Sequence, residues 1–74
     1  MSLFSAKQTV TLSVLGMHCP KCVARVTEAL EAADGVTSVQ VSLEQENAVV
    51  EGRGLDAEAL VAVVNELGFQ ASLA

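Results

Sequence analysis

Two cysteines, Cys19 and Cys22, carry the clearest chemistry in the chain, and both lie in the stretch Gly16-Met17-His18-Cys19-Pro20-Lys21-Cys22. Thiols separated by two residues can converge on one small ion, and thiolates select Cu(I) and similar soft metals over hard cations. We interpret the pair as a soft-metal site. The same spacing also serves disulfide oxidoreductases and halves of zinc sites, so the spacing alone leaves these alternatives open.

The number of ligands in this loop narrows the choice of metal. A closed zinc site needs four ligands, whereas the loop holds two cysteines and one histidine, His18, without a carboxylate. Low coordination favours Cu(I), Ag(I) or Hg(II). A site with few ligands also suits metal transfer, because the thiols of a partner can join the ion before the first thiols leave.

Length and charge limit the classes of function. The chain has 74 residues and a net charge of −5 at pH 7, which leaves room for one domain and disfavours attraction to nucleic acid or anionic membranes. No apolar run reaches signal-peptide length or the ~18 residues of a membrane-spanning helix. We therefore expect a cytosolic protein without direct membrane insertion, whose closely spaced cysteines are metal ligands or redox-active thiols.

The spacing of apolar residues predicts the elements that position the two thiols. In chain order they are a strand over 9–15, a helix over 21–33, strands over 38–43 and 48–51, a helix over 57–67 and a strand over 69–73. Residues 1–8 show no such spacing, so we expect a disordered lead-in there and one domain over 9–74. The cysteine loop is thus predicted to join the first strand to the first helix.

Capping signals mark the ends of both predicted helices. Gly35 is placed for the left-handed residue that ends the first helix. Asp56 is placed to cap the second helix, and Gly68 to stop it. The residues expected to face the core from the second helix and the last strand are Leu60, Val63, Val64, Leu67, Phe69, Ala71 and Leu73.

Two strand-helix-strand halves in this order fold as a four-stranded antiparallel sheet with both helices packed on one face. The predicted fold class is therefore α+β, a ferredoxin-like βαββαβ sandwich. The halves share the pattern but not the chemistry. The second turn from strand to helix, Gly52-Arg53-Gly54-Leu55-Asp56, holds nothing that could bind a metal.

Residues around the thiols are expected to modify their chemistry. Unpaired amides and the dipole at the helix start should lower the pKa of Cys22, helped by Lys21 and Arg25. These two basic residues could steer an acidic partner or simply form a solvated face.

Three other side chains near the loop have expected places. Met17 should pack beneath the loop rather than act as a thioether ligand, and His18 should point outward into solvent. Phe69 is expected in the core at the edge of the sheet. It could also shield the site, because in this fold the loop before the last strand lies beside the loop after the first.

The cysteine motif and the closing Leu67-Gly68-Phe69 resemble the heavy-metal-associated domain family, whose signature is G-M-x-C-x-x-C. The resemblance covers residues 9–73. It implies a ferredoxin-like fold, with Cys19 and Cys22 as metal ligands and Met17 as the buried residue that supports the loop. The family includes cytosolic copper chaperones, amino-terminal modules of copper-exporting P-type ATPases, mercury-binding proteins and the amino-terminal domain of mercuric reductase.

By this resemblance the leading hypothesis is a copper chaperone, not an enzyme, that holds Cu(I) between Cys19 and Cys22. It would deliver the ion to a copper-transporting P-type ATPase or another C-x-x-C domain, and two chains could share one ion in a metal-bridged homodimer. Phe69 leaves chaperone and ATPase module open, because bacterial copper chaperones often have tyrosine there. A mercuric reductase module that binds Hg(II) is a further alternative.

A thiol-disulfide oxidoreductase is the competing enzyme hypothesis, because the motif Cys-Pro-x-Cys also occurs in glutaredoxin-like sites. A thioredoxin-like fold would place a second, cis proline opposite the cysteines. Pro20 is the only proline in the chain, and the predicted order of strands also fits that fold poorly. The sequence therefore disfavours redox catalysis.

Overall fold

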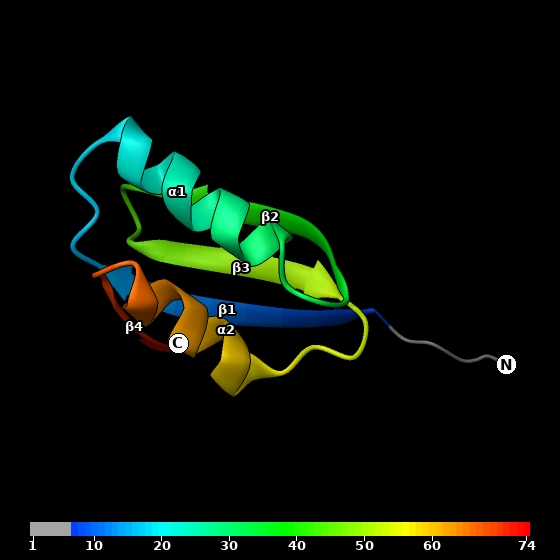
Figure 1. Cartoon of the computed structure of the whole chain (residues 1–74). Coiled ribbons are helices and arrows are strands. Elements are labelled where there is room, and N and C mark those ends of the chain that lie inside the picture. Colours follow the sequence, from blue (N-terminus) through cyan, green and yellow to red (C-terminus); the bar gives the residue numbers. More distant parts are fainter. Residues whose placement is uncertain (1–6) are drawn as a thin grey trace, which may run out of the picture.

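In the described part of the chain, four strands and two helices follow one another in the predicted order (Figure 1). They are β1 (Gln8–Leu15), α1 (Pro20–Glu31), β2 (Val36–Ser42), β3 (Asn47–Gly52), α2 (Ala57–Glu66) and β4 (Gln70–Leu73). The computed structural model of the protein describes residues 7–74. A lead-in is expected over residues 1–8, and residues 1–6 of it lie outside the described residues. Gln8 already belongs to β1.

The strands form one antiparallel sheet in the order β2-β3-β1-β4. Both helices lie on one face of this sheet (Figure 1), which confirms the predicted α+β ferredoxin-like sandwich. Strand β1 is central, because it pairs with β3 along residues 8–13 and with β4 along residues 12–15. The cysteine loop therefore leaves the sheet from a middle strand.

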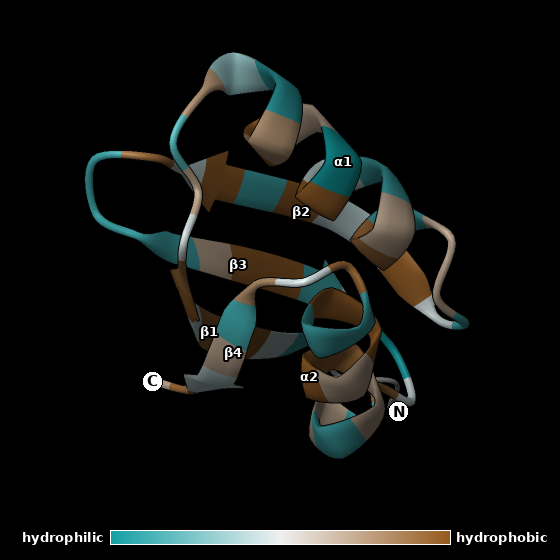
Figure 2. Ribbon diagram, turned by 60° about the vertical axis from the view of Figure 1, so that its left-hand side comes forward, coloured by the Kyte–Doolittle hydropathy of each residue, from teal (hydrophilic) through white to brown (hydrophobic). Residues whose placement is uncertain are grey.

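The core lies between the sheet and the helices. Alternate residues of a strand point to the same face, so every second residue of the strands faces the helices. The buried residues are Leu12, Val14, Met17, Val26, Leu30, Ala48, Val50, Leu60 and Val64. Figure 2 shows hydrophobic and hydrophilic residues alternating along the strands and around both helices. Within residues 7–74 no polar or charged side chain is buried, so burial of small aliphatic side chains holds the layers together.

Helix α1 begins earlier than predicted, at Pro20 rather than Lys21. Cys19 has an extended backbone, with φ −156° and ψ 164°, and occupies the position that caps the helix. Proline is well tolerated as the first helical residue, because its missing N–H has no partner there and its φ already suits a helix. Pro20 therefore starts the helix, and both cysteines belong to its first turn or its cap.

Gly35 does not cap α1 as predicted, since the helix ends at Glu31 with Ala32 as its C-cap. Gly35 does have a left-handed φ of +85°, and it serves a close backbone crossing instead. The amide of Arg53 donates to the carbonyl of Gly35 at 2.8 Å. A β-carbon on Gly35 would overlap the carbonyl oxygen of Arg53, and one on Gly52 would overlap that of Gly35. Two glycines therefore let the turn before β2 cross the end of β3.

Both predicted ends of α2 are confirmed. The Asp56 carboxylate accepts hydrogen bonds from the amides of Glu58 at 3.1 Å and Ala59 at 3.3 Å. At the other end Gly68, with φ +102°, follows the C-cap residue Leu67. These caps fix where α2 begins and where it ends.

Three apolar positions differ from prediction. Val61 rather than Val63 packs against the buried cluster, and Val61 also lines the hollow between α2 and β4. Leu73 is 55% exposed, since it ends a short strand at the edge of the sheet. Leu43 lies in the hairpin turn and not in β2. The spacing of apolar residues shows which of them share one face of a helix or strand, but not whether another element covers that face.

Candidate metal site

The loop from β1 to α1 leads to Cys19 at the helix cap and Cys22 in the first turn of α1, and Met17 supports it from beneath. Gly16 turns the chain out of β1 with a φ of +101°. Met17 then points into the core, with 4% of its surface exposed, which confirms the predicted packing under the loop. The loop thus has an anchor in the core, and the residues after Met17 lie at the surface or half-buried.

Cys19 and Cys22 are brought together by the first turn of α1. Their Sγ atoms lie 3.5 Å apart, and both are free thiols that are half-buried. The carbonyl of Cys19 accepts hydrogen bonds from the amides of Cys22 at 3.0 Å and Val23 at 3.3 Å. This turn fixes the separation of the two Cα atoms, so the spacing of two residues becomes a pair of adjacent sulfurs.

The pKa of the Cys22 thiol lies below its ordinary value. The largest cause is a hydrogen bond with the backbone of His18, followed by the hydrogen bond with the Cys19 side chain, while desolvation opposes both. The positive charge of Arg25 is the smallest cause, and Lys21 is not among the causes. The predicted direction is therefore correct, but backbone groups and the second thiol outweigh the neighbouring charges.

The lowered pKa makes a testable difference in thiol reactivity, because the thiolate is the form that reacts with alkylating agents. In the metal-free protein, the pH midpoint for alkylation of Cys22 should lie below that of an unstructured cysteine peptide. Mass spectrometry of digested samples measures the rate at which Cys22 is alkylated at each pH, and these rates give the midpoint. The midpoint should rise in Cys19→Ala, which removes the side-chain hydrogen bond to Cys22, and change less in Arg25→Ala. A Cys22 profile identical to that of the peptide would contradict this picture.

In the part of the chain that the structure describes, no third ligand joins the two thiols. Within residues 7–74 no group of three or more His, Cys, Asp or Glu side chains is close enough to hold a metal ion. His18 is exposed, as predicted. Lys21 and Arg25 are also exposed, and neither pairs with a carboxylate of the described residues. The candidate site is thus a pair of sulfurs flanked by two exposed cations.

Phe69 lies beside the start of the cysteine loop. A β-carbon on Gly16 would stand 3.6 Å from Cδ1 of the Phe69 ring, and Leu15 pairs with Gln70 across β1 and β4. The ring is half-buried and packs against the core. The expected proximity of the loop after β1 to the loop before β4 is therefore confirmed, and the Phe69 ring lies beside Gly16.

The helix-capping position of Cys19 is a feature that the sequence prediction missed. Pro20 carries the signal that could have revealed it, because proline favours the first position of a helix. This position holds Cys19 in an ordered backbone, at the same helix end as Cys22.

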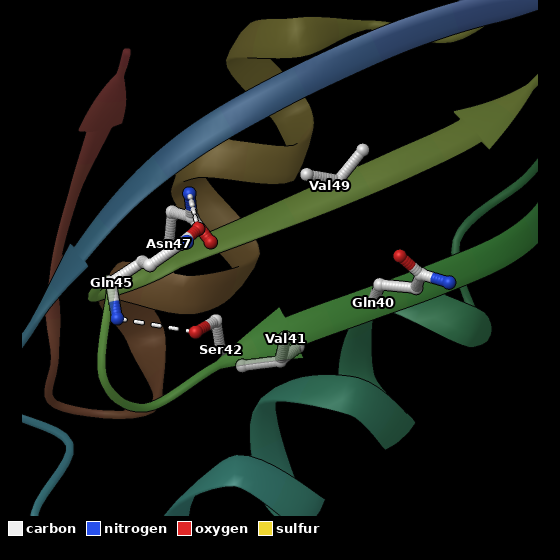
Figure 3. Close-up of a pocket in the computed structure, with 6 residues that line it drawn as sticks. All are labelled: Gln40, Val41, Ser42, Gln45, Asn47 and Val49. Carbon is white, nitrogen blue, oxygen red and sulfur yellow. Dashed lines mark hydrogen bonds between the residues drawn. The ribbon is translucent and has the colours of Figure 1, made fainter.

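A separate hollow of about 410 Å³ lies on the hairpin of β2 and β3 (Figure 3). Its lining residues are Gln40, Val41, Ser42, Gln45, Asn47 and Val49. The hydroxyl of Ser42 accepts a hydrogen bond from the amide of Gln45 at 3.1 Å. The hollow contains no thiol and no titratable group, so it is no alternative to the dithiol site.

Comparison with known sequences relates this chain to a protein family. Residues 11–70 match the sequence model of the heavy-metal-associated domain. The chain is 36% identical over 69 residues to a copper-exporting P-type ATPase of Vibrio cholerae and 40% identical over 61 residues to a mercuric reductase of Shewanella putrefaciens. These alignments cover 93% and 81% of this chain but only 8% and 11% of the two relatives.

A relative of similar size also matches. The copper chaperone CopZ of Enterococcus hirae is 43% identical over 63 residues, which cover 82% of this chain and 91% of the chaperone. This comparison extends over nearly the whole length of the relative.

Solved structures give the same grouping. Oxidized MerP from Ralstonia metallidurans superimposes with a TM-score of 0.84 and 36% identity, over 92% of this chain and 97% of that one. The apo form of the Enterococcus hirae copper chaperone gives a TM-score of 0.82 and 40% identity, over 88% and 98%.

Within residues 7–74 the helices are too short, or not apolar enough, for any of them to cross a membrane. The match to the family model takes in most of the sequence, and the copper chaperone relative is matched over nearly all of its length. The chain therefore belongs to the heavy-metal-associated domain family.

Proposed function

We propose that Cys19 and Cys22 together bind one soft metal ion, Cu(I), and that the protein passes this ion to another C-x-x-C protein. The observation that carries the proposal is the distance of 3.5 Å between the two sulfurs at the start of α1. Metal–thiolate bonds are about 2.3 Å long in zinc sites, so one ion between the sulfurs can reach both. Thiolate ligands favour Cu(I) over harder ions.

The surroundings of the sulfurs support binding of a thiolate pair. Two thiolates around Cu(I) leave one net negative charge, which the amino end of α1 and the side chain of Lys21 would offset. The lowered pKa of Cys22 favours the deprotonated ligand at neutral pH. Since metal binding displaces thiol protons, affinity should rise with pH until both thiols are ionised.

Transfer to a partner follows from the small number of ligands. With no third protein ligand within residues 7–74, incoming thiols of a partner can bind the ion before either cysteine leaves. A metal-transporting P-type ATPase or another C-x-x-C domain is the partner we propose. The exposed Lys21 and Arg25, on a chain that is otherwise acidic, would favour an acidic surface around the partner's cysteines.

Several finer expectations from the sequence belong to this proposal. They are a cytosolic location, a domain over residues 9–74, transfer rather than catalysis, and a homodimer bridged by one metal ion. The similarity to the copper chaperone of Enterococcus hirae supports the transfer role.

Binding of Hg(II) is the second candidate function. The similarity to a mercuric reductase and to MerP supports it, and a pair of thiolates suits Hg(II) as well as Cu(I). The chain would then serve as the metal-binding module of a larger protein, either a mercuric reductase or a P-type ATPase.

Anaerobic titration of the reduced protein with Cu(I), against a chromophoric chelator that competes for the ion, tests the proposal. We expect tight binding of one Cu(I) per chain or per dimer. A parallel titration with Hg(II) shows which ion the site prefers. Binding too weak to compete with the chelator would exclude the copper proposal. Reduction of a model disulfide with turnover would instead favour an oxidoreductase.

A further inference from the structure

Among the strands of residues 7–74, β4 lies at the edge of the sheet and pairs only with β1. In an antiparallel pair the peptide groups of alternate residues point toward the partner strand, and those between point away. The amide of Ala74 donates to the carbonyl of Thr11 in β1 at 3.0 Å. By this alternation, the peptide groups of Ala71 and Leu73 point away from β1, toward the open edge.

A side chain from α2 occupies this edge. The Asn65 side chain accepts a hydrogen bond from the amide of Ala71 at 2.8 Å through Oδ1, and donates to the Ala71 carbonyl at 3.4 Å through Nδ2. A carboxamide has the same donor and acceptor as a peptide group. Asn65 therefore makes the two hydrogen bonds that a residue of a fifth strand would make with Ala71.

Apolar side chains of α2 and β4 lie beside this edge, together with Glu58 and Ser72. A hollow of about 460 Å³ lies between α2 and β4, and Val61, Ala62 and Leu73 contribute to its lining. Leu73 is 55% exposed. An edge strand with unpaired peptide groups and adjacent apolar surface is a template for strand pairing. Without the Asn65 side chain, both Ala71 and Leu73 would be available to such a strand.

The other edge of the sheet is protected differently. The pairing of β2 with β3 shifts register between Val36 and Ser38, and such an irregularity twists an edge strand away from regular pairing. The pairing of β4 with β1 runs without a register shift. At β4 it is the Asn65 side chain that pairs the outward peptide groups of Ala71.

We propose that Asn65 stands in for a neighbouring strand and keeps the β4 edge from pairing with the β4 edge of a second copy of this chain. A second copy is the fitting partner because a two-fold antiparallel pairing brings the same edge and the same apolar hollow together from both sides. This proposal is independent of the metal site, since neither Cys19 nor Cys22 takes part in it.

Sedimentation velocity of the full chain over a series of concentrations tests the proposal. The protein is kept reduced and free of metal by a reductant and a chelator, so that neither disulfides nor ions bridge two chains. The Asn65→Ala variant should associate with itself about tenfold more strongly than the unaltered protein, the change expected from about one net backbone hydrogen bond. The amide of Ala71 should also exchange its hydrogen faster in the dilute variant.

Matched variants separate the edge from other causes. Asn65→Asp keeps the acceptor for the Ala71 amide but cannot donate to the Ala71 carbonyl, so it should associate less than Asn65→Ala. Asn47→Ala removes a carboxamide elsewhere and should behave like the unaltered protein. Adding Ala71→Pro to Asn65→Ala removes the outward N–H and should abolish the association. The proposal is overturned if Asn65→Ala keeps the native spectrum and stays as monomeric as the unaltered protein. Association that persists with Ala71→Pro would overturn it equally.

Discussion

Substitution of either Cys19 or Cys22 by serine is expected to abolish tight Cu(I) binding. A serine hydroxyl is a hard ligand that stays protonated at neutral pH, and no third ligand within residues 7–74 can replace the lost thiolate. Loss of a supporting group near a metal typically costs about 10–100-fold in affinity, so loss of one of two ligands should cost more than about a hundredfold. The anaerobic competition titration measures this loss.

The structure supplies controls for that experiment. Cys19 caps α1 without a side-chain hydrogen bond to the helix, and serine is a preferred capping residue. Cys19→Ser should therefore unfold at the same or higher temperature than the metal-free unaltered protein, which separates loss of a ligand from loss of fold. His18→Ala should bind Cu(I) as tightly as before, because His18 is exposed. Unchanged affinity in both cysteine variants would rule out the dithiolate site.

Gly35→Ala is expected to destabilise the protein by about 2–5 kcal/mol. The new methyl group would overlap the carbonyl oxygen of Arg53, and overpacking of this kind costs about 1–3 kcal/mol. The left-handed φ of +85° adds about 1–2 kcal/mol for a residue with a β-carbon. Since domains of this size are only marginally stable, a large part of the protein should be unfolded. Urea denaturation followed by circular dichroism measures the loss.

Two neighbouring glycines separate the contributions to this cost. Gly54 has a left-handed φ of +64°, but a β-carbon there would meet no atom within 4 Å, so Gly54→Ala should show only the backbone cost. Gly52 lacks a left-handed φ, yet its β-carbon would overlap the carbonyl oxygen of Gly35, so Gly52→Ala should show only the steric cost. Equal stability of Gly35→Ala and Gly54→Ala would show that the backbone crossing relaxes freely.

The proposed metal site combines order with access. The first turn of α1 positions both cysteines, and Met17 anchors the loop in the core. The sulfurs remain only half-buried, so a partner can approach them. This combination suits an ion that is to be held and then passed on.

Much of the fold was accessible from local patterns. In the strand predicted over 9–15, Leu12 and Val14 alternate with polar residues as in a strand with one buried face, and both are fully buried. Asp56 and Gly68 predicted the two ends of α2, because capping depends on residues within one turn of the helix end. The cysteine motif likewise predicted which residues would lie together, since two residues of spacing at a helix start bring their side chains to the same end.

By itself, then, the sequence determined the order of the elements, the residues of the central core and the pair of thiols. Only the tertiary structure decided which distant segments are in contact and which side chains stay exposed. It sets Gly35 against Arg53, Phe69 beside Gly16 and Asn65 on the edge of β4, and it leaves Leu73 exposed to solvent. The physical reason is that periodicity and capping report on groups within a few residues along the chain. Contacts between distant segments depend on strand lengths and on how helices lie on the sheet, which no local pattern records.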